Sequence, residues 1–191
     1  MRPIERSEVL PIGEYEQIRP RFRQRVIEEK RARRVRVGEH MSLVFENRDT
    51  VLFQIQEMLR TERITSESGI GHEIETYNDL IPGEGQLSVT LFVEIPDKDL
   101  REQMLVELRG LEEKVAIEVD GERFAFGGKR QESMPDRTTA VHYLKASLSA
   151  EARAAMRSGK AKAAIVIEHP RYEAREELGQ ATLASLAEDL A

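Results

Sequence analysis

The 191-residue chain contains no cysteine. Without thiols it cannot form disulfides, use a cysteine nucleophile, or hold zinc or an iron–sulfur cluster through cysteine ligands. A chain of this length buries about 70% of the surface that it exposes when unfolded, so its core needs neither a disulfide nor a metal. We therefore expect a globular protein of a reducing compartment, most simply the cytoplasm.

Long apolar runs and nucleotide-binding or nucleophile motifs are absent as well. The N-terminal fifteen residues have no apolar stretch of signal-peptide length. The densest apolar run, AAIVI at 163–167, is far shorter than the ~20 residues of a membrane helix. There is no Gly-x-Ser-x-Gly elbow, dinucleotide fingerprint or Walker spacing. These absences predict a cytoplasmic protein with no membrane segment, and they lower the expectation of an enzyme.

Acidic residues predominate, with a net charge of −6, but basic residues concentrate in one segment. Residues 16–36 hold nine basic and three acidic residues, a net +6 that leaves −12 for the rest of the chain. One interpretation is a partner-binding surface; its basic residues would be Arg25, Arg31, Arg33 and Arg34. The other is a charged helix lying against its own acidic domain. The scarcity of nearby aromatic residues argues against nucleic acid as the partner.

The hydrophobic pattern predicts an α+β protein. Before residue 86 it indicates a helix over 14–34, a strand over 41–46, a helix over 48–64 capped by Asn47, and a less regular stretch over 65–85. Beyond it the pattern indicates the following elements: a strand at 86–95, a helix after Asp97, a hairpin at 114–126, a loop at 126–137, a strand at 139–148, a short helix after Ser149, a strand at 161–169 and a last helix at 172–190.

This order is that of a ferredoxin-like split βαβ core with one additional strand. An antiparallel sheet with helices on one face would be its natural packing. We therefore predict an N-terminal helical region with one short strand, residues 1–85, packed on a sheet core with a C-terminal helix, residues 86–191, as one compact unit.

The segment 48–64 carries polar residues among its apolar ones, which raises the question of a site. Gln54, Glu57 and Thr61 lie together on a second face of the predicted helix, beside Phe53 and Ile64. If that face is covered, Glu57 needs a nearby cation such as Arg60. One interpretation is a polar pocket formed by Gln54, Glu57, Arg60 and Thr61. The other is a structural network that docks the N-terminal arginine helix.

Histidines and carboxylates provide weak candidates for a metal site. His72 and Glu75 are three residues apart, which would place them on one side of a helix. Together with Glu57, His142 or His169 they could hold iron, manganese or zinc. His142 and His169 lie on apolar faces of predicted strands, where a histidine is more often a core residue than a ligand.

Four segments resemble a known family: FENRDTVLFQIQEMLRTERI at 45–64, YNDLIPGEGQLSVTLFVEI at 77–95, VHYL at 141–144 and HPRY at 169–172. Over nearly its whole length the chain resembles the bacterial domain-of-unknown-function family 3501. The resemblance implies gene neighbours such as rubrerythrin and a cysteine-rich iron–sulfur oxidoreductase, and hence a link to redox or peroxide defence. It implies no catalytic residues.

These observations together favour a non-catalytic accessory or partner-binding protein of a bacterial redox system. Its partner would be an iron or iron–sulfur protein, bound through the basic helix or through the polar face of 48–64. The alternative is a metal-binding protein or metal-dependent enzyme with a carboxylate and histidine site. Substrate, bound metal and self-association into a homo-oligomer are left open by the sequence.

Overall fold

The structure, a computed structural model, describes residues 1–128 and 136–190. Its helices are η1 (Arg6–Glu8), α1 (Ile12–Arg33), α2 (Arg48–Thr61), α3 (Glu67–Asn78), α4 (Lys98–Glu107), η2 (Leu111–Glu113), α5 (Ala150–Arg157) and α6 (Gln180–Asp189). Its strands are β1 (Arg34–Val37), β2 (Met41–Glu46), β3 (Gln86–Val93), β4 (Val115–Val119), β5 (Glu122–Ala125), β6 (Val141–Ser147), β7 (Ala163–His169) and β8 (Tyr172–Glu177). The predicted α+β class is confirmed. None of the described helices has the length and apolar character needed to cross a membrane.

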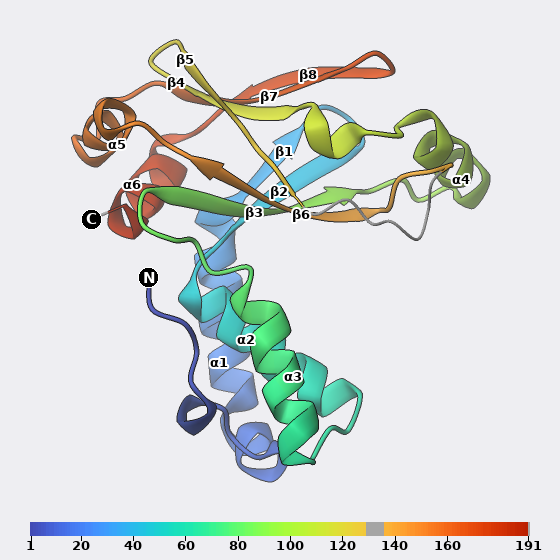
Figure 1. Cartoon of the computed structure of the whole chain (residues 1–191), viewed down its shortest axis with the longest axis vertical. Helices are drawn as coiled ribbons and strands as arrows, with labels where there is room; N and C mark the ends of the chain where they lie inside the picture. The colour runs from blue at the N-terminus through green and yellow to red at the C-terminus, as the bar shows by residue number, and fades with distance from the viewer. Residues whose placement is uncertain (129–135, 191) are drawn as a thin grey trace.

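Within the described residues the strands form two antiparallel sheets, in the orders β1-β2-β3-β6 and β5-β4-β7-β8. The two sheets face each other, and α1, α2 and α3 extend from the far side of the first sheet (Figure 1). Alternate residues of each strand point into the space between the sheets, as the period of two requires. The main core therefore lies there; its members include Phe45, Leu87, Val89, Leu91, Ile117, Leu144, Ile165 and Ile167.

The single ferredoxin-like sheet predicted from the element order is wrong. β3 and β6 belong to the first sheet, whereas β4 and β7 belong to the second. The reason lies in the pairing: β2 occupies one edge of β3, and β4 and β7 pair with each other and with their own hairpin partners. One face of the first sheet is therefore covered by the second sheet, and helices lie on the other (Figure 1).

Two local predictions also need correction. Residues 172–177 form strand β8 and not the start of a helix, and the C-terminal helix begins only at Gln180. HPRY is the tight turn of the β7–β8 hairpin, with His169 paired to Tyr172. Tyr172 and Ala174 pack against the main core while their neighbours face solvent, so packing at period two overrides the helical propensity of this segment. The predicted loop at 126–137 is described only at 126–128 and 136–137.

Strand β1 and helix α3 were not predicted. Ser66 caps α3 by accepting a hydrogen bond from the Gly69 amide at 3.2 Å. The apolar side of α3 joins a second core between α2, α3 and the N-terminal segment, which includes Ile4, Val9, Val51, Ile55, Leu59, Ile70 and Ile74. Since β1 and β2 precede residue 86 and lie in one sheet with β3 and β6, hydrogen bonds of that sheet cross the expected boundary. That residues 1–85 and 86–191 unfold as one unit stays a prediction.

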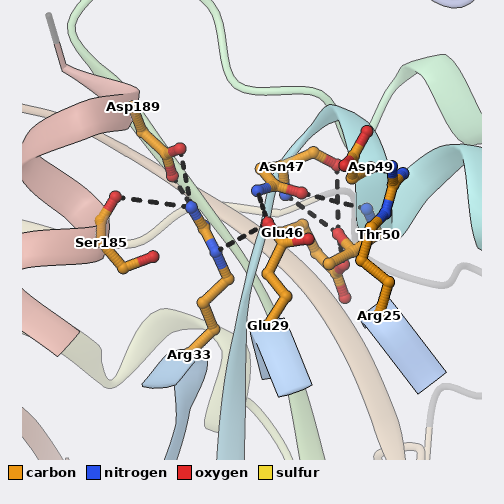
Figure 2. A network of polar contacts seen from close by, with 9 residues as sticks. All are labelled: Arg25, Glu29, Arg33, Glu46, Asn47, Asp49, Thr50, Ser185 and Asp189. Atoms are coloured by element: carbon orange, nitrogen blue, oxygen red, sulfur yellow. Dashed lines mark hydrogen bonds and ion pairs between the residues drawn. The ribbon is translucent and has the colours of Figure 1, made fainter. Parts of the chain in front are cut away.

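A buried polar network ties α1 to the N-terminus of α2 and to α6 (Figure 2). Arg33 is only 2% exposed, and its two terminal nitrogens each lie 2.7 Å from a carboxylate oxygen of Asp189. Glu29 lies 3.4 Å from the Arg33 Nε and also accepts a hydrogen bond from the Asn47 amide. Asn47 caps α2 by accepting from the Thr50 backbone N–H at 3.0 Å. The network fixes where the long helix α1 crosses the rest of the fold.

Candidate functional site

A cavity of about 810 Å³ lies along β6. Its walls come from the end of α3, from β3 and β6, from the α4–η2 turn, and from residues 127–128 and 137–139. We call it the β6 cavity. Its volume falls in the range of roughly 300–1,000 Å³ that is typical of sites for small organic ligands.

Strand register places the polar residues on one side of this cavity. Glu46, Ser88 and Lys145 are direct neighbours across β2, β3 and β6, and Thr90 is paired with Tyr143 in the same way. Both oxygens of the Glu46 carboxylate accept hydrogen bonds within the fold, one from the Thr90 hydroxyl at 2.6 Å and one from the Thr50 hydroxyl. Of this row, Ser88, Tyr143 and Lys145 line the cavity.

The Ser88 hydroxyl has no hydrogen-bond partner in the part of the chain that the structure describes. Its residue is only 1% exposed, so bulk water does not compensate for the missing bond. A buried polar group without a partner costs about 1–3 kcal/mol, which makes such groups rare. Because Ser88 also lines the β6 cavity, a molecule held there can supply the partner.

Two further polar residues of the cavity are held in their neutral forms. Burial lowers the pKa of His142 below its usual value, and its Nε2 lies 3.1 Å from the Thr138 hydroxyl. Burial also raises the pKa of the Tyr143 hydroxyl, and the neighbouring Tyr77 and then Glu46 raise it further. At neutral pH both side chains therefore present uncharged hydrogen-bonding groups to the cavity.

Among the described residues, charge in the cavity wall comes from three cations, Arg109, Arg137 and Lys145, and two acids, Asp79 and Glu112. Arg137 is ion-paired with Glu102 at 2.5 Å, and the Lys145 ammonium donates to the Ile81 carbonyl at 2.9 Å. Both acids are engaged in interactions of their own. Arg109 is exposed, and no ion pair joins it to another described residue.

The polar face of α2 does not belong to the β6 cavity. Glu57 accepts hydrogen bonds from Arg19, at 2.7 and 2.9 Å, and from the Tyr15 hydroxyl at 2.6 Å. The hydrogen bond from Arg19 lowers the pKa of Glu57, and burial raises the pKa of Tyr15 above its usual value. Arg60 is paired with Glu16 at 2.6 Å. These contacts connect α2 to α1, which is the structural network that the sequence left as one of two interpretations.

The remaining members of the predicted polar pocket contribute little to a site. Gln54 is half-buried and Thr61 is exposed at the end of α2. Neither lines the β6 cavity. Gln56, a polar residue of the same segment that was not counted in the predicted pocket, is the buried amide of this helix: it binds the Leu10 backbone N–H at 2.7 Å and carbonyl at 3.1 Å.

The candidate metal ligands lie on several different elements. Glu57 is bound by α1, His72 and Glu75 are exposed on α3, and His142 lines the β6 cavity. Both ring nitrogens of the buried His169 are within hydrogen-bond distance of backbone groups, at 3.1 and 3.2 Å. Over residues 1–128 and 136–190, no three histidine, aspartate or glutamate side chains are grouped so that they could hold a metal ion.

The basic residues of α1 and β1 are largely paired within the chain. The contacts are Arg25 with Asp49 at 2.9 Å, Arg31 with Glu28 at 2.7 Å, Arg33 with Asp189, and Arg34 with Glu94. Arg33 is buried and bound to Asp189 of α6, so its charge is not presented to a partner. The arrangement agrees with a charged helix that lies against its own acidic domain.

Fold and cavity together define the class: an α+β protein of two facing antiparallel sheets, extended by three helices, with a cavity along the edge strand β6. The chain belongs to the family described as "Protein of unknown function (DUF3501)", whose model matches residues 3–190. The resemblance carried by the four sequence segments is thus confirmed.

The chain is similar over its whole length to a solved structure, the crystal structure of a novel protein of unknown function from Burkholderia pseudomallei K96243. The two chains are 32% identical, the alignment covers 100% of each, and the TM-score is 0.93. Among curated proteins, none matches the chain.

Of the residues that line the β6 cavity, the sequence had singled out only His142. Ser88, Lys145, Tyr143 and Arg109 were missed because they come together only through strand register and through the α4–η2 turn. One signal was available: the strand at 86–95 carries Ser88 and Thr90 on the face opposite its apolar residues. An antiparallel strand with one core face can expose such residues to water, so this alternation alone did not indicate a site.

Proposed function

We propose that the chain is a binding protein without catalytic activity of its own, which takes up a small organic molecule in the β6 cavity. The observation that carries this proposal is the cavity of about 810 Å³ whose lining includes a buried serine hydroxyl without a hydrogen-bond partner among the described residues. Aliphatic and aromatic side chains make up much of the rest of the wall, among them Leu80, Val141 and Tyr77. A mostly apolar cavity with a few converging polar groups is the usual form of a ligand site.

Filling part of the cavity is expected to weaken binding. Thr76 is exposed on α3 and lines the β6 cavity, so an indole placed there occupies ligand space without disturbing the core. In titrations with the fluorescent neutral probe N-phenyl-1-naphthylamine, we expect one site per chain, and an affinity at least about tenfold lower for Thr76→Trp.

A matched control is Thr61→Trp, which makes the same change at an exposed position of α2 outside the cavity. It should bind the probe as the unmodified chain does. Equal loss of binding in both variants, or no binding by the unmodified chain, would contradict the proposal.

We further propose an accessory role in a bacterial redox or peroxide-defence system, with an iron or iron–sulfur protein as partner. Support for the redox link comes from the family resemblance and its implied gene neighbours. Support for a docking surface comes from Arg21 and Arg23, which are exposed on α1 and have no ion pair with another described residue. Positive charge on one surface speeds and orients the encounter with an acidic partner.

Reversing this charge tests the accessory role. With purified rubrerythrin from the same organism as the probe, Arg21→Glu combined with Arg23→Glu should weaken association about tenfold and reduce its salt dependence. Arg157→Glu, at an exposed position on α5, is the control and should change neither quantity. If rubrerythrin is not retained by the unmodified chain at low salt, this partner is excluded.

A further inference from the structure

We infer that the chain has a second binding site, for the phosphate group of a small molecule, in a shallow groove between the end of α1 and the far side of the first sheet. The groove has a volume of about 520 Å³, and it shares no lining residue with the β6 cavity. Four of its described lining residues are cations, Lys30, Arg31, Arg34 and Arg36, and one is an acid, Glu94. We call it the α1–β1 groove. The inference goes beyond both proposed functions and rests on neither of them.

Strand alternation and the direct connection of α1 to β1 place these cations on one side of the first sheet. The valines of β1 are members of the core between the two sheets. Arg34 and Arg36 alternate with these valines, so they point to the opposite side, where α1 lies. Helix α1 continues into β1 without a loop, and the Arg34 backbone N–H donates to the Lys30 carbonyl. Lys30 therefore lies one helical turn before Arg34, beside the same space.

Two of the cations keep a charge that no described carboxylate compensates. The ammonium of Lys30, a half-buried residue, has no hydrogen bond or ion pair with another described residue. The Arg36 guanidinium donates to the backbone carbonyls of Gly38, at 3.3 Å, and Glu39, at 2.5 Å. A carbonyl group carries no net charge, so these hydrogen bonds hold the guanidinium in place without neutralising it. The groove thus offers a prepositioned positive charge next to a second one.

Arg34 is also held in place, but its charge is compensated. Its guanidinium donates to the Ser42 hydroxyl at 3.0 Å and lies 5.4 Å from the centroid of the Phe92 ring. It is ion-paired with Glu94, which is the one acid in the described lining of the groove. Glu94 therefore opposes the binding of an anion, because it repels the anion and occupies N–H groups of Arg34.

The charge balance of the groove suits a phosphate group better than a carboxylate. Arg31 is paired with the exposed Glu28 at 2.7 Å, so four cations face two acids among the described residues. A phosphate ester brings about 1.5 to 2 negative charges and three acceptor oxygens on one phosphorus. A carboxylate brings a single charge and two oxygens. One phosphate group can therefore compensate both Lys30 and Arg36.

The surroundings of the groove favour a small ligand over a nucleic acid. The chain outside residues 16–36 carries a net charge of −12. A long polyanion that extends beyond the groove would meet this acidic surface and be repelled by it, whereas a compact phosphorylated molecule stays beside the cations.

Isothermal titration calorimetry with inorganic pyrophosphate at low salt tests the site. We expect one site per chain, and citrate, whose similar charge is spread over carboxylates, should bind at least about tenfold more weakly. Lys30→Gln and Arg36→Gln should each lower the affinity for pyrophosphate about tenfold. Glu94→Gln should raise that affinity, because it removes a negative charge and frees N–H groups of Arg34.

The control is Arg157→Gln, which removes an exposed arginine of α5 outside the groove and should leave pyrophosphate binding unchanged. Thr76→Trp should leave it unchanged as well, so failure of this site is distinguishable from failure of the proposed binding in the β6 cavity. The inference is overturned if pyrophosphate does not bind, if citrate binds equally well, or if neither Lys30→Gln nor Arg36→Gln weakens binding. Tighter binding of a single-stranded oligothymidylate than of pyrophosphate would make nucleic acid the ligand and would also overturn it.

Discussion

Replacing Asp189 by alanine should lower the free energy of unfolding by about 3–5 kcal/mol, since it leaves a buried charge without its main partner. Both terminal nitrogens of Arg33 bind the Asp189 carboxylate, and the guanidinium is almost wholly removed from water. The remaining neighbours are Glu29, at 3.4 Å, and the Ser185 carbonyl, also at 3.4 Å. Urea unfolding followed by circular dichroism measures the change.

Two comparisons make the test specific to burial. Asp49→Ala breaks the exposed pair with Arg25 and should cost less than about 1 kcal/mol. Replacing both members of the buried pair, Arg33→Met with Asp189→Leu, should recover most of the lost stability, because no charge is then left uncompensated. If Asp189→Ala lowers the free energy of unfolding as little as Asp49→Ala does, Arg33 must be solvated or paired with another anion in the variant.

The network explains why the basic segment could be interpreted in two ways from the sequence. The net charges of 16–36 and of the remainder suit both an acidic partner and an acidic domain of the same chain. The pairing of Arg33 with Asp189 joins residues 156 positions apart, and no local pattern identifies such a contact. A partner-binding surface needs exposed arginines, whereas a helix that lies against its own domain buries some of them. Whether Arg33 is buried depends on how α1 packs on α6.

Elements that rest on local signals were predicted well, and those that depend on tertiary packing were not. Helix α2 follows from its Asn47 cap and its apolar stripe, and β3 follows from its strict alternation. The segment YEAREE is rich in good helix formers, yet it is a strand because β7 offers an edge to pair with. The strands divide into two sheets because a strand can pair only with an edge that no other strand occupies. The order of elements along the chain does not specify which edges are occupied.

The residues of the candidate site also differ in whether a local sequence pattern or only the tertiary structure places them there. Sequence alternation placed His142 on an apolar face, and it does lie half-buried in the wall of the β6 cavity. The adjacency of Ser88 and Lys145 follows from the antiparallel register of β3 and β6, which a shift of one residue would destroy. The position of Arg109 depends on the turn through Gly110, which adopts a left-handed conformation with φ of 81°. Neither feature is fixed by a periodic pattern.

Phe45→Ala is the second substitution for which we expect a large loss, about 3–5 kcal/mol of unfolding free energy. Phe45 points from β2 into the core between the sheets, where it is 0% exposed, so its removal leaves a cavity that the surrounding strands cannot easily close. Phe53→Ala is the matched control. Phe53 is only half-buried on α2, where its ring packs edge to face on Phe22 with 5.7 Å between the ring centroids. Its replacement by alanine should therefore lower the free energy of unfolding by roughly 1 kcal/mol.

The same variant tests whether residues 1–85 and 86–191 unfold together. β2 is paired with β3 over its whole length, so a defect at Phe45 should destabilise both parts of the chain. Hydrogen exchange followed by mass spectrometry should therefore show faster exchange under Phe45→Ala in α2 and, to a similar extent, in β7 of the facing sheet. Acceleration confined to residues before 86 would mean that the helical region opens independently. The sheet order favours joint unfolding, because the first sheet loses two of its four strands when the N-terminal part opens, and that exposes the core beneath them.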